Sequence, residues 1–456
     1  MRVLLLTYGT RGELEPFVAL GRALRDAGHE AVLAGPAPFA PFAAAHGVEF
    51  AALDAGLAAG LRETMAGGRG VLRRMSLVRT LAAGGPALRR VLDDAWDAAR
   101  AVRPDVVAHH AFPMAGHHLA ERLGVPGALV VLDPMYLPTS AFPNPLYPAP
   151  ARLPRGLNRA TYELPALAWR FTAPTVGRWR REALRLPRER SGRAAARRVG
   201  EGARLVLNAT SRHVLPPPPD WPPAVRTIGY LRLPPPPGWR PPAALAAFLD
   251  AGEPPVCIGF GSAVGRDPAA SGRIVADAVA RAGVRAVVVG GAGGIRVDDP
   301  GTRARRLCFV DEAPYEWLLP RVSAVVHHGG GTTTPAVASG RPQVVCPFGG
   351  DQPSWARAMH RIGVAPPPLP QSRLTAAGLA AALREALESR EIVRRAADLG
   401  RRVRREDAGA AAVAELTELH LRGRPLPVSE KRSYYMKYKY LSDGPAGDGD
   451  FRERTG

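Results

Sequence analysis

The 456-residue sequence has only three cysteines, and they lie far apart. Cys257, Cys308 and Cys346 each sit in or beside an apolar run, which predicts buried free thiols and no disulfide framework. No CxxC pair and no His/Cys cluster has the spacing of zinc ligands. We therefore expect no metal site, and a reducing cytoplasmic location fits this composition.

Long apolar runs are also missing. No stretch reaches the roughly 18 apolar residues of a membrane span. The N-terminal MRVLLLTYGTRGE has an apolar run too short for a signal peptide and is broken by glycine and charge. We expect a soluble protein, for which a peripheral membrane contact stays open and the oligomeric state is unknown.

The net charge of +20 comes from 61 basic and 41 acidic residues. Almost all the basic residues are arginines scattered through Ala-, Gly- and Pro-rich sequence, with no basic stripe interleaved with aromatics before the tail. This pattern argues against a nucleic-acid partner. A hydrophobic fraction of 46% and the chain length predict a packed α/β protein of two domains.

Short apolar runs alternate with amphipathic stretches over residues 1–210, the pattern of a doubly wound parallel sheet. Residues 211–242 are too rich in proline for a helix or an inner strand, and we interpret them as a linker. The alternation restarts over residues 243–427, which predicts a second lobe. Residues 428–456 hold every lysine of the chain amid clustered tyrosines, so we expect an atypical, flexible tail.

The segment AVVHHGGGTTTPAVASGRPQVVCPFGGDQ, residues 324–352, carries the clearest chemistry. A predicted strand ends at two histidines, three glycines follow, and threonines then open a helix. Glycines allow a diphosphate to approach the backbone, and the N–H groups and dipole of a helix start favour an anion. A tight strand-to-helix turn is the alternative interpretation. Asp351 and Gln352 follow the next strand, within reach of sugar hydroxyls, and Asp351 could also serve as a helix N-cap.

Together with other stretches, this segment resembles the donor-binding signature of the UDP-glycosyltransferase superfamily, nearest to its sterol-glucosyltransferase-like branch and the bacterial antibiotic glycosyltransferases. The other stretches are GTRGELEPFVALGRALRDAGHE, GRWRREALRLP, DWPPAVRTIGY, PPVCIGFGS and PYEWLLPRVSAVVHHGG. The resemblance implies a GT-B fold of two Rossmann-like lobes, with the acceptor mainly in the first and the nucleotide sugar mainly in the second. It implies no cofactor beyond the co-substrate, a UDP- or TDP-sugar.

The resemblance also implies roles for individual residues. The residues at the diphosphate would be Ser262, His328, Gly330, Gly331, Thr332 and Thr333. Asp351 and Gln352 would hold the sugar, and Phe309 and Val310 would pack the nucleotide base. The sequence departs from the family at Gly331–Thr332, where the family has a small residue and then glycine, and at Glu13, where the family has aspartate.

Glycosyl transfer to a hydroxyl needs a base, because the hydroxyl must lose its proton as it attacks the anomeric carbon. Glu13 follows the first predicted strand, at the edge of the sheet where ligands bind. His110 follows the strand PDVVAH and is the other candidate, either as the base or as a partner that orients Glu13. Glu13 could instead only cap the following helix.

Apolar segments of the first lobe are expected to line the acceptor site. They are residues 55–95 and the stretch MYLPTSAFPNPLYPAP, from which Met135, Tyr136 and Phe142 are taken as acceptor residues. The acceptor is therefore expected to be a hydrophobic, hydroxylated small molecule. The activity predicted is inverting, metal-independent hexosyl transfer. Alternatives are a sugar-nucleotide epimerase of the same fold, a non-catalytic sugar-nucleotide-binding homologue and, on the weak match IGFGSAVG, a dinucleotide-dependent oxidoreductase.

Overall fold

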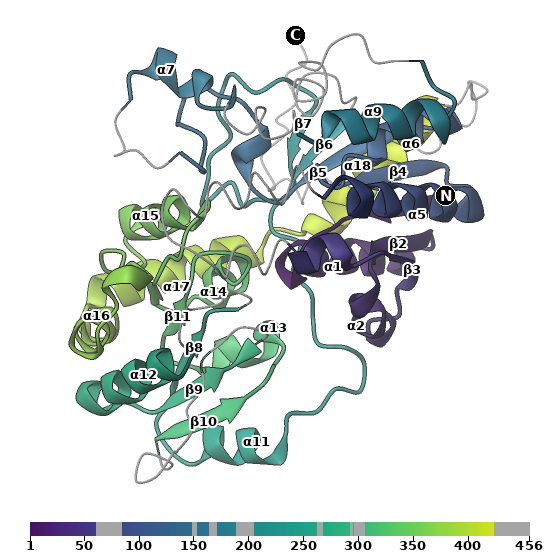
Figure 1. Ribbon diagram of the computed structural model, residues 1–456. Helices are drawn as coiled ribbons and strands as arrows, with labels where there is room; N and C mark the ends of the chain where they lie inside the picture. The colour runs from purple at the N-terminus through teal and green to yellow at the C-terminus, as the bar shows by residue number, and fades with distance from the viewer. Residues whose placement is uncertain are drawn as a thin grey trace, which may run out of the picture.

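The computed structural model describes residues 1–60, 84–147, 153–163, 171–187, 205–261, 268–291, 295 and 306–423. Two parallel sheets form two lobes, one of seven strands and one of five (Figure 1). This is the GT-B architecture expected from the sequence. Both sheets are buried on two faces, in keeping with their apolar, β-branched strands.

The first sheet has the strand order β3-β2-β1-β4-β5-β6-β7. Helices α1 and α18 pack on one face, whereas α5, α6 and α9 pack on the other. The strands are β1 (Arg2–Leu6), β2 (Glu30–Pro36), β3 (Glu49–Leu53), β4 (Val106–His109), β5 (Gly127–Val131), β6 (Leu205–Asn208) and β7 (Val225–Thr227). The helices are α1 (Arg11–Asp26), η1 (Ala37–Phe39), α2 (Ala40–Ala45), α5 (Gly85–Val102), α6 (Gly116–Leu123), η2 (Pro134–Tyr136), α7 (Arg155–Ala160), α9 (Ala173–Glu182) and α18 (Ala408–Gly423).

The second sheet has the order β10-β9-β8-β11-β12. Its strands are β8 (Val256–Gly259), β9 (Ala286–Val289), β10 (Leu307–Val310), β11 (Val325–His327) and β12 (Gln343–Val345). Its helices are α11 (Ala243–Asp250), α12 (Pro268–Ala282), α13 (Tyr315–Leu318), η5 (Leu319–Arg321), α14 (Thr333–Ser339), α15 (Gln352–Ile362), η6 (Gln371–Arg373), α16 (Ala376–Glu388) and α17 (Arg390–Arg404). One core lies between this sheet and α12 with α16, and another lies on the side of α11 and α13.

The lobes exchange segments at their boundaries. Strand β7 comes from the proline-rich stretch expected as a linker, and it adds the edge strand of the first sheet. Helix α18 was expected within the second lobe, up to residue 427. It packs instead against α1, where Ala412 and Leu416 join the first-lobe core (Figure 1). The chain therefore crosses between the lobes twice, and the tail expected from residue 428 lies outside the described residues.

Candidate active site

Glu13 lies in the first turn of α1, directly after β1 and its loop. The Thr10 N–H donates to Glu13 Oε2 at 2.7 Å, and the Thr10 hydroxyl donates to the same oxygen at 2.6 Å. Glu13 thus does cap its helix, as the alternative interpretation expected. Only one of its two oxygens is used, and among the described residues Oε1 has no hydrogen-bond partner. Gly9 lies so close that a Cβ there would be 2.9 Å from Oε2.

His110 follows β4 and is buried, with 6% of its surface exposed. Neither ring nitrogen has a hydrogen-bond partner in the described part of the chain. The ring stands edge-on to Phe17 and to Tyr136, with centroid distances of 6.2 and 5.9 Å. Burial lowers the pKa of His110 to about 4, and the neighbouring His109 adds to this effect. The imidazole is therefore neutral at pH 7 and can accept one hydrogen bond.

Asp133 lies just after β5 and was not singled out from the sequence. Its Oδ1 accepts a hydrogen bond from the Met135 N–H at 2.8 Å, which caps η2. Burial and then the Asp351 carboxylate raise the pKa of Asp133 well above its ordinary value, and Glu13 adds to the increase. The sequence signal was present, because Asp133 follows a strand at the same edge as Glu13 and His110.

Asp351 and Gln352 lie at the start of α15 in the second lobe. The Trp355 indole N–H donates to Asp351 Oδ2 at 3.0 Å, and the side chain makes no cap hydrogen bond. Burial raises the pKa of Asp351 to about 6, and Glu13 contributes to the increase. Gln352 Oε1 accepts from the N–H groups of Phe348 and Gly349 at 2.8 and 3.3 Å. Its amide nitrogen makes no hydrogen bond among the described residues.

The two histidines of the HHGGG segment have different surroundings. His327 Nδ1 accepts from the Gly329 N–H at 3.1 Å, and its Nε2 lies 2.9 Å from Gln343 Oε1. His327 is therefore fully bonded inside the lobe. His328 is 8% exposed, and its Nδ1 is buried without a partner among the described residues. Burial lowers the pKa of His328 to about 3, with a contribution from His327.

Glycines enclose the His328 ring. A Cβ at Gly330 would lie 2.4 Å from Nε2 of His328, and a Cβ at Gly261 would lie 3.0 Å from its Cε1. A side chain at Gly330 would therefore force the loop or the His328 ring to shift.

The threonines after this loop open α14. Thr332 is its N-cap residue and Thr333 its first residue, and both are buried. Thr333 Oγ1 is a second buried polar atom without a partner in the described structure. The buried polar atoms of His328 and Thr333 are therefore both available for a hydrogen bond to a ligand.

The site predicted for the nucleotide base lies at the end of β10. Phe309 has 38% of its surface exposed, and Val310 is half-buried. An exposed aromatic ring is available for contact with a planar base. Ser262, the remaining predicted diphosphate residue, lies outside the described residues.

The lobes touch at the carboxyl ends of both sheets. A Cβ at Gly331 would lie 3.1 Å from the Cα of Gly12, so the HHGGG loop meets the start of α1. Pro16 lies inside α1 and has no N–H to donate to the Gly12 carbonyl. Arg11 of the first lobe pairs with Glu312 of the second at 2.5 Å.

The predicted acceptor residues lie in the segment that follows β5. Met135 and Tyr136 belong to η2, and Asn144 Nδ2 fastens this turn by donating to the Met135 carbonyl at 2.9 Å. The Phe142 carbonyl lies 3.5 Å from the Tyr162 hydroxyl, at the limit of a hydrogen bond. Ser354 of α15 donates to the Pro145 carbonyl at 2.8 Å, which ties this wall to the second lobe. Part of the other predicted wall, residues 61–83, lies outside the described residues.

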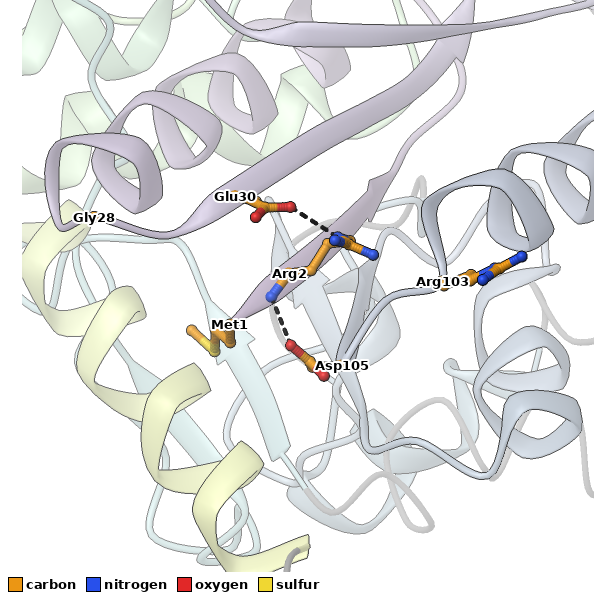
Figure 2. A pocket seen from close by; sticks show the side chains of 6 residues that line it. All are labelled: Met1, Arg2, Gly28, Glu30, Arg103 and Asp105. Carbon is orange, nitrogen blue, oxygen red and sulfur yellow. Dashed lines mark hydrogen bonds and ion pairs between the residues drawn. The ribbon is translucent and has the colours of Figure 1, made fainter.

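A cavity of about 280 Å³ lies at the opposite, amino-terminal edge of the first sheet (Figure 2). Two of its carboxylates are bonded within it: Arg2 Nε donates to Glu30 at 2.7 Å, and the Arg2 N–H donates to Asp105 at 2.8 Å. Figure 2 shows Arg2 between these two carboxylates. Ligands of doubly wound sheets bind at the other edge, so we assign this cavity no role.

Within the described ranges, no group of three or more His, Cys, Asp or Glu side chains is arranged to hold a metal ion. None of the described helices has the length and apolarity that a membrane crossing requires.

Comparison with known proteins identifies the class of protein as a glycosyltransferase. Residues 3–141 match the glycosyltransferase family 28 N-terminal domain. Residues 301–419 match the C-terminal domain described as erythromycin biosynthesis protein CIII-like. Solved structures of similar fold include the kitacinnamycin glycotransferase, with a TM-score of 0.66, 19% identity and coverage of 92% of this chain and 99% of the other. Another is the calicheamicin glycosyltransferase CalG4, with a TM-score of 0.65, 19% identity and coverage of 94% and 100%.

Proteins of related sequence show which glycosyltransferase family the chain belongs to. Sterol 3-beta-glucosyltransferases UGT80B1 and UGT80A2 of Arabidopsis thaliana are 30% and 31% identical to the chain, over 91% of its length. The sterol 3-beta-glucosyltransferase of Leptosphaeria maculans is 30% identical, also over 91%. The chain covers 67%, 64% and 28% of these three proteins. It belongs to the glycosyltransferase family that includes them.

His328 provides a direct test of the predicted diphosphate site. Replacing it with alanine should weaken UDP or TDP binding by about 1–3 kcal/mol, because a hydrogen bond to a charged oxygen is lost. Isothermal titration calorimetry measures the change. His360→Ala is the control, since His360 is exposed on α15 and bonds the Ala365 carbonyl instead. Equal UDP affinity in the wild type and in His328→Ala would refute the assignment.

Proposed function

We propose that this protein is an inverting glycosyltransferase. It moves a hexose from a UDP- or TDP-sugar to a hydroxyl of an apolar small molecule, either a natural product or a sterol-like lipid. The observation that carries the proposal is the contact of Gly12 with Gly331, which brings the loop of a candidate base against the loop of a candidate diphosphate site. Membership of the family adds support, as does a fold shared with a glycosyltransferase solved with dTDP, VinC (TM-score 0.61, 19% identity, 92% and 100% coverage).

The proposed reaction is a single displacement. Glu13 Oε1 takes the proton of the acceptor hydroxyl while the oxygen attacks the anomeric carbon. The bond from that carbon to the diphosphate breaks on the opposite face, which inverts the configuration. Thr10 holds Oε2 and so fixes the direction of Oε1.

The leaving diphosphate takes the bonding electrons and needs donors. His328, Thr333 and the backbone N–H groups of the loop provide them in the proposed mechanism. Asp351 and the Gln352 amide would hold the sugar hydroxyls, and Phe309 and Val310 the base. The acceptor would lie against Met135, Tyr136 and Phe142.

This arrangement predicts that turnover needs no metal ion. Because the diphosphate charge is met by N–H groups and His328, excess EDTA should leave the initial rate unchanged. The rate is compared with and without EDTA on enzyme freed of adventitious metal. Activity that is lost with EDTA and returns with magnesium or manganese would mean that the leaving group is stabilised differently.

Turnover with an acceptor tests the function itself. The enzyme should form a glycoside from a nucleotide sugar and an aglycone. Interconversion of two nucleotide sugars without an acceptor would favour the epimerase, whereas binding without any reaction would favour a non-catalytic homologue.

A further inference from the structure

The segment of residues 134–147, called the acceptor loop below, contains the proposed acceptor residues and follows β5. After η2 it has neither helix nor strand. This irregular part includes Pro138, Pro143 and Pro145. Proline has no N–H to donate, and no ladder of backbone hydrogen bonds fixes the loop. Its shape therefore depends on side chains that bond to it.

Asp220 lies in the proline-rich stretch between β6 and β7 and holds the middle of the acceptor loop. The Thr139 hydroxyl donates to Asp220 Oδ1 at 2.6 Å. The Ser140 N–H and hydroxyl donate to Oδ2 at 2.7 and 2.9 Å. Burial opposes ionisation, but these hydrogen bonds lower the pKa of Asp220 below its ordinary value. One ionised carboxylate therefore fixes this turn through charge-assisted hydrogen bonds.

Trp221, the next residue, supports the beginning of the same loop. Its indole N–H donates to the Leu137 carbonyl at 3.3 Å. The rings of Trp221 and Tyr136 both pack against the buried cluster that contains Leu129, Val131 and Leu137. The stretch that carries Asp220 is therefore packed together with Tyr136, one of the proposed acceptor residues.

The acceptor loop is also tied to α7 and to the second lobe. Asn158 Nδ2 of α7 donates to the Ser140 carbonyl at 2.9 Å. The Ser354 hydroxyl of α15 donates to the Pro145 carbonyl at 2.8 Å. Ser354 lies two residues after Gln352, which is proposed to hold the donor sugar. Side chains from separate parts of the chain thus fix the loop and its distance from the start of α15.

We propose that Asp220 is a positioning residue for the acceptor. This inference rests on the proposed function. Asp220 acts through the acceptor loop, which it holds in the conformation in which Met135, Tyr136 and Phe142 contact the acceptor. A preformed loop spares the acceptor the entropy cost of ordering it, so affinity for the acceptor is higher.

Steady-state kinetics of Asp220→Ala tests this role. The donors are UDP- and TDP-glucose, and the acceptors are a panel of apolar hydroxylated aglycones that includes cholesterol and umbelliferone. With the acceptor that the wild type uses fastest, the acceptor KM should rise roughly ten- to hundredfold, because the loop loses its three hydrogen bonds to Asp220. The value of kcat and the affinity for UDP should stay close to those of the wild type. Asp220→Asn keeps one oxygen that can accept from Ser140, so the acceptor KM should rise measurably but less.

Asp105→Ala is the matched control. Asp105 also accepts a backbone N–H bond, from Arg2 at 2.8 Å, but at the opposite edge of the first sheet (Figure 2). This variant should keep the wild-type KM. The midpoint of thermal unfolding is measured for every variant, because a merely structural role of Asp220 would lower the midpoint and leave the acceptor KM unchanged.

An unchanged acceptor KM in Asp220→Ala overturns the inference while the proposed function stands, as does an equal rise in Asp105→Ala. If Asp220→Ala does not fold, an unchanged KM in Asp220→Asn has the same meaning. No glycoside from the wild type with any acceptor of the panel overturns the proposed function and this inference with it.

Discussion

Replacing Glu13 with glutamine is expected to lower kcat by about two to four orders of magnitude, the usual contribution of a general base. Glutamine keeps the shape of the side chain and an oxygen that can accept both hydrogen bonds from Thr10. The helix cap therefore survives, and only the basic atom is lost. Steady-state kinetics with saturating donor and acceptor measures kcat, while calorimetry should show an almost unchanged affinity for UDP.

Two further variants test whether Glu13 or His110 is the general base. Glu13→Asp restores the residue of the family and should keep part of the activity, limited by a carboxylate that is set back by one methylene. His110→Ala tests the other candidate, whose lowered pKa of about 4 makes it a weak base. Near-normal turnover of Glu13→Gln together with an inactive His110→Ala would assign the proton transfer to His110. Glu13 would then only cap α1.

Replacing Gly330 with alanine is expected to weaken UDP or TDP binding by about two orders of magnitude, from strain in the loop together with a lost His328 contact. The new Cβ would lie 2.4 Å from Nε2 of His328. Either the loop or the imidazole has to move. Calorimetry with UDP measures the loss, and the midpoint of thermal unfolding shows whether the fold is intact.

Gly156→Ala is the control for this variant, because Gly156 is the second residue of α7 and a Cβ built there has nothing within 4 Å. It should bind UDP like the wild type. Wild-type affinity in Gly330→Ala would mean that the loop adapts without cost, and the proposed role of the enclosed His328 ring would be wrong.

Most of the fold could be predicted because its signals are local. Buried strands such as β1 and β11 are short apolar runs, and the helices that follow them carry apolar faces of helical period. The placement of α18 could not be predicted, because an amphipathic helix has the same pattern whichever lobe it covers. Strand β7 was not predicted because it lies in a proline-rich stretch, although an edge strand tolerates nearby prolines.

The candidate site residues that belong to one sequence motif could be predicted. Those that come together only where the lobes meet were harder to predict. The positions of His328 and Asp351 followed from a single segment, although their roles stay predictions. Asp133 required knowing that β5 lies beside β4 at the cleft edge, a fact of the sheet order. The use of Gln352 Oε1 by two backbone N–H groups depends on the turn geometry of residues 348–352.

Analysis of the product tests most directly whether the enzyme transfers a hexose with inversion. The enzyme is incubated with α-linked UDP- and TDP-hexoses and a panel of apolar hydroxylated aglycones. Mass spectrometry identifies the product, and the coupling constant of the anomeric proton gives its configuration. We predict an aglycone that has gained one hexose in β linkage. Retention of the α configuration, or consumption of the nucleotide sugar without any glycoside, would contradict the account.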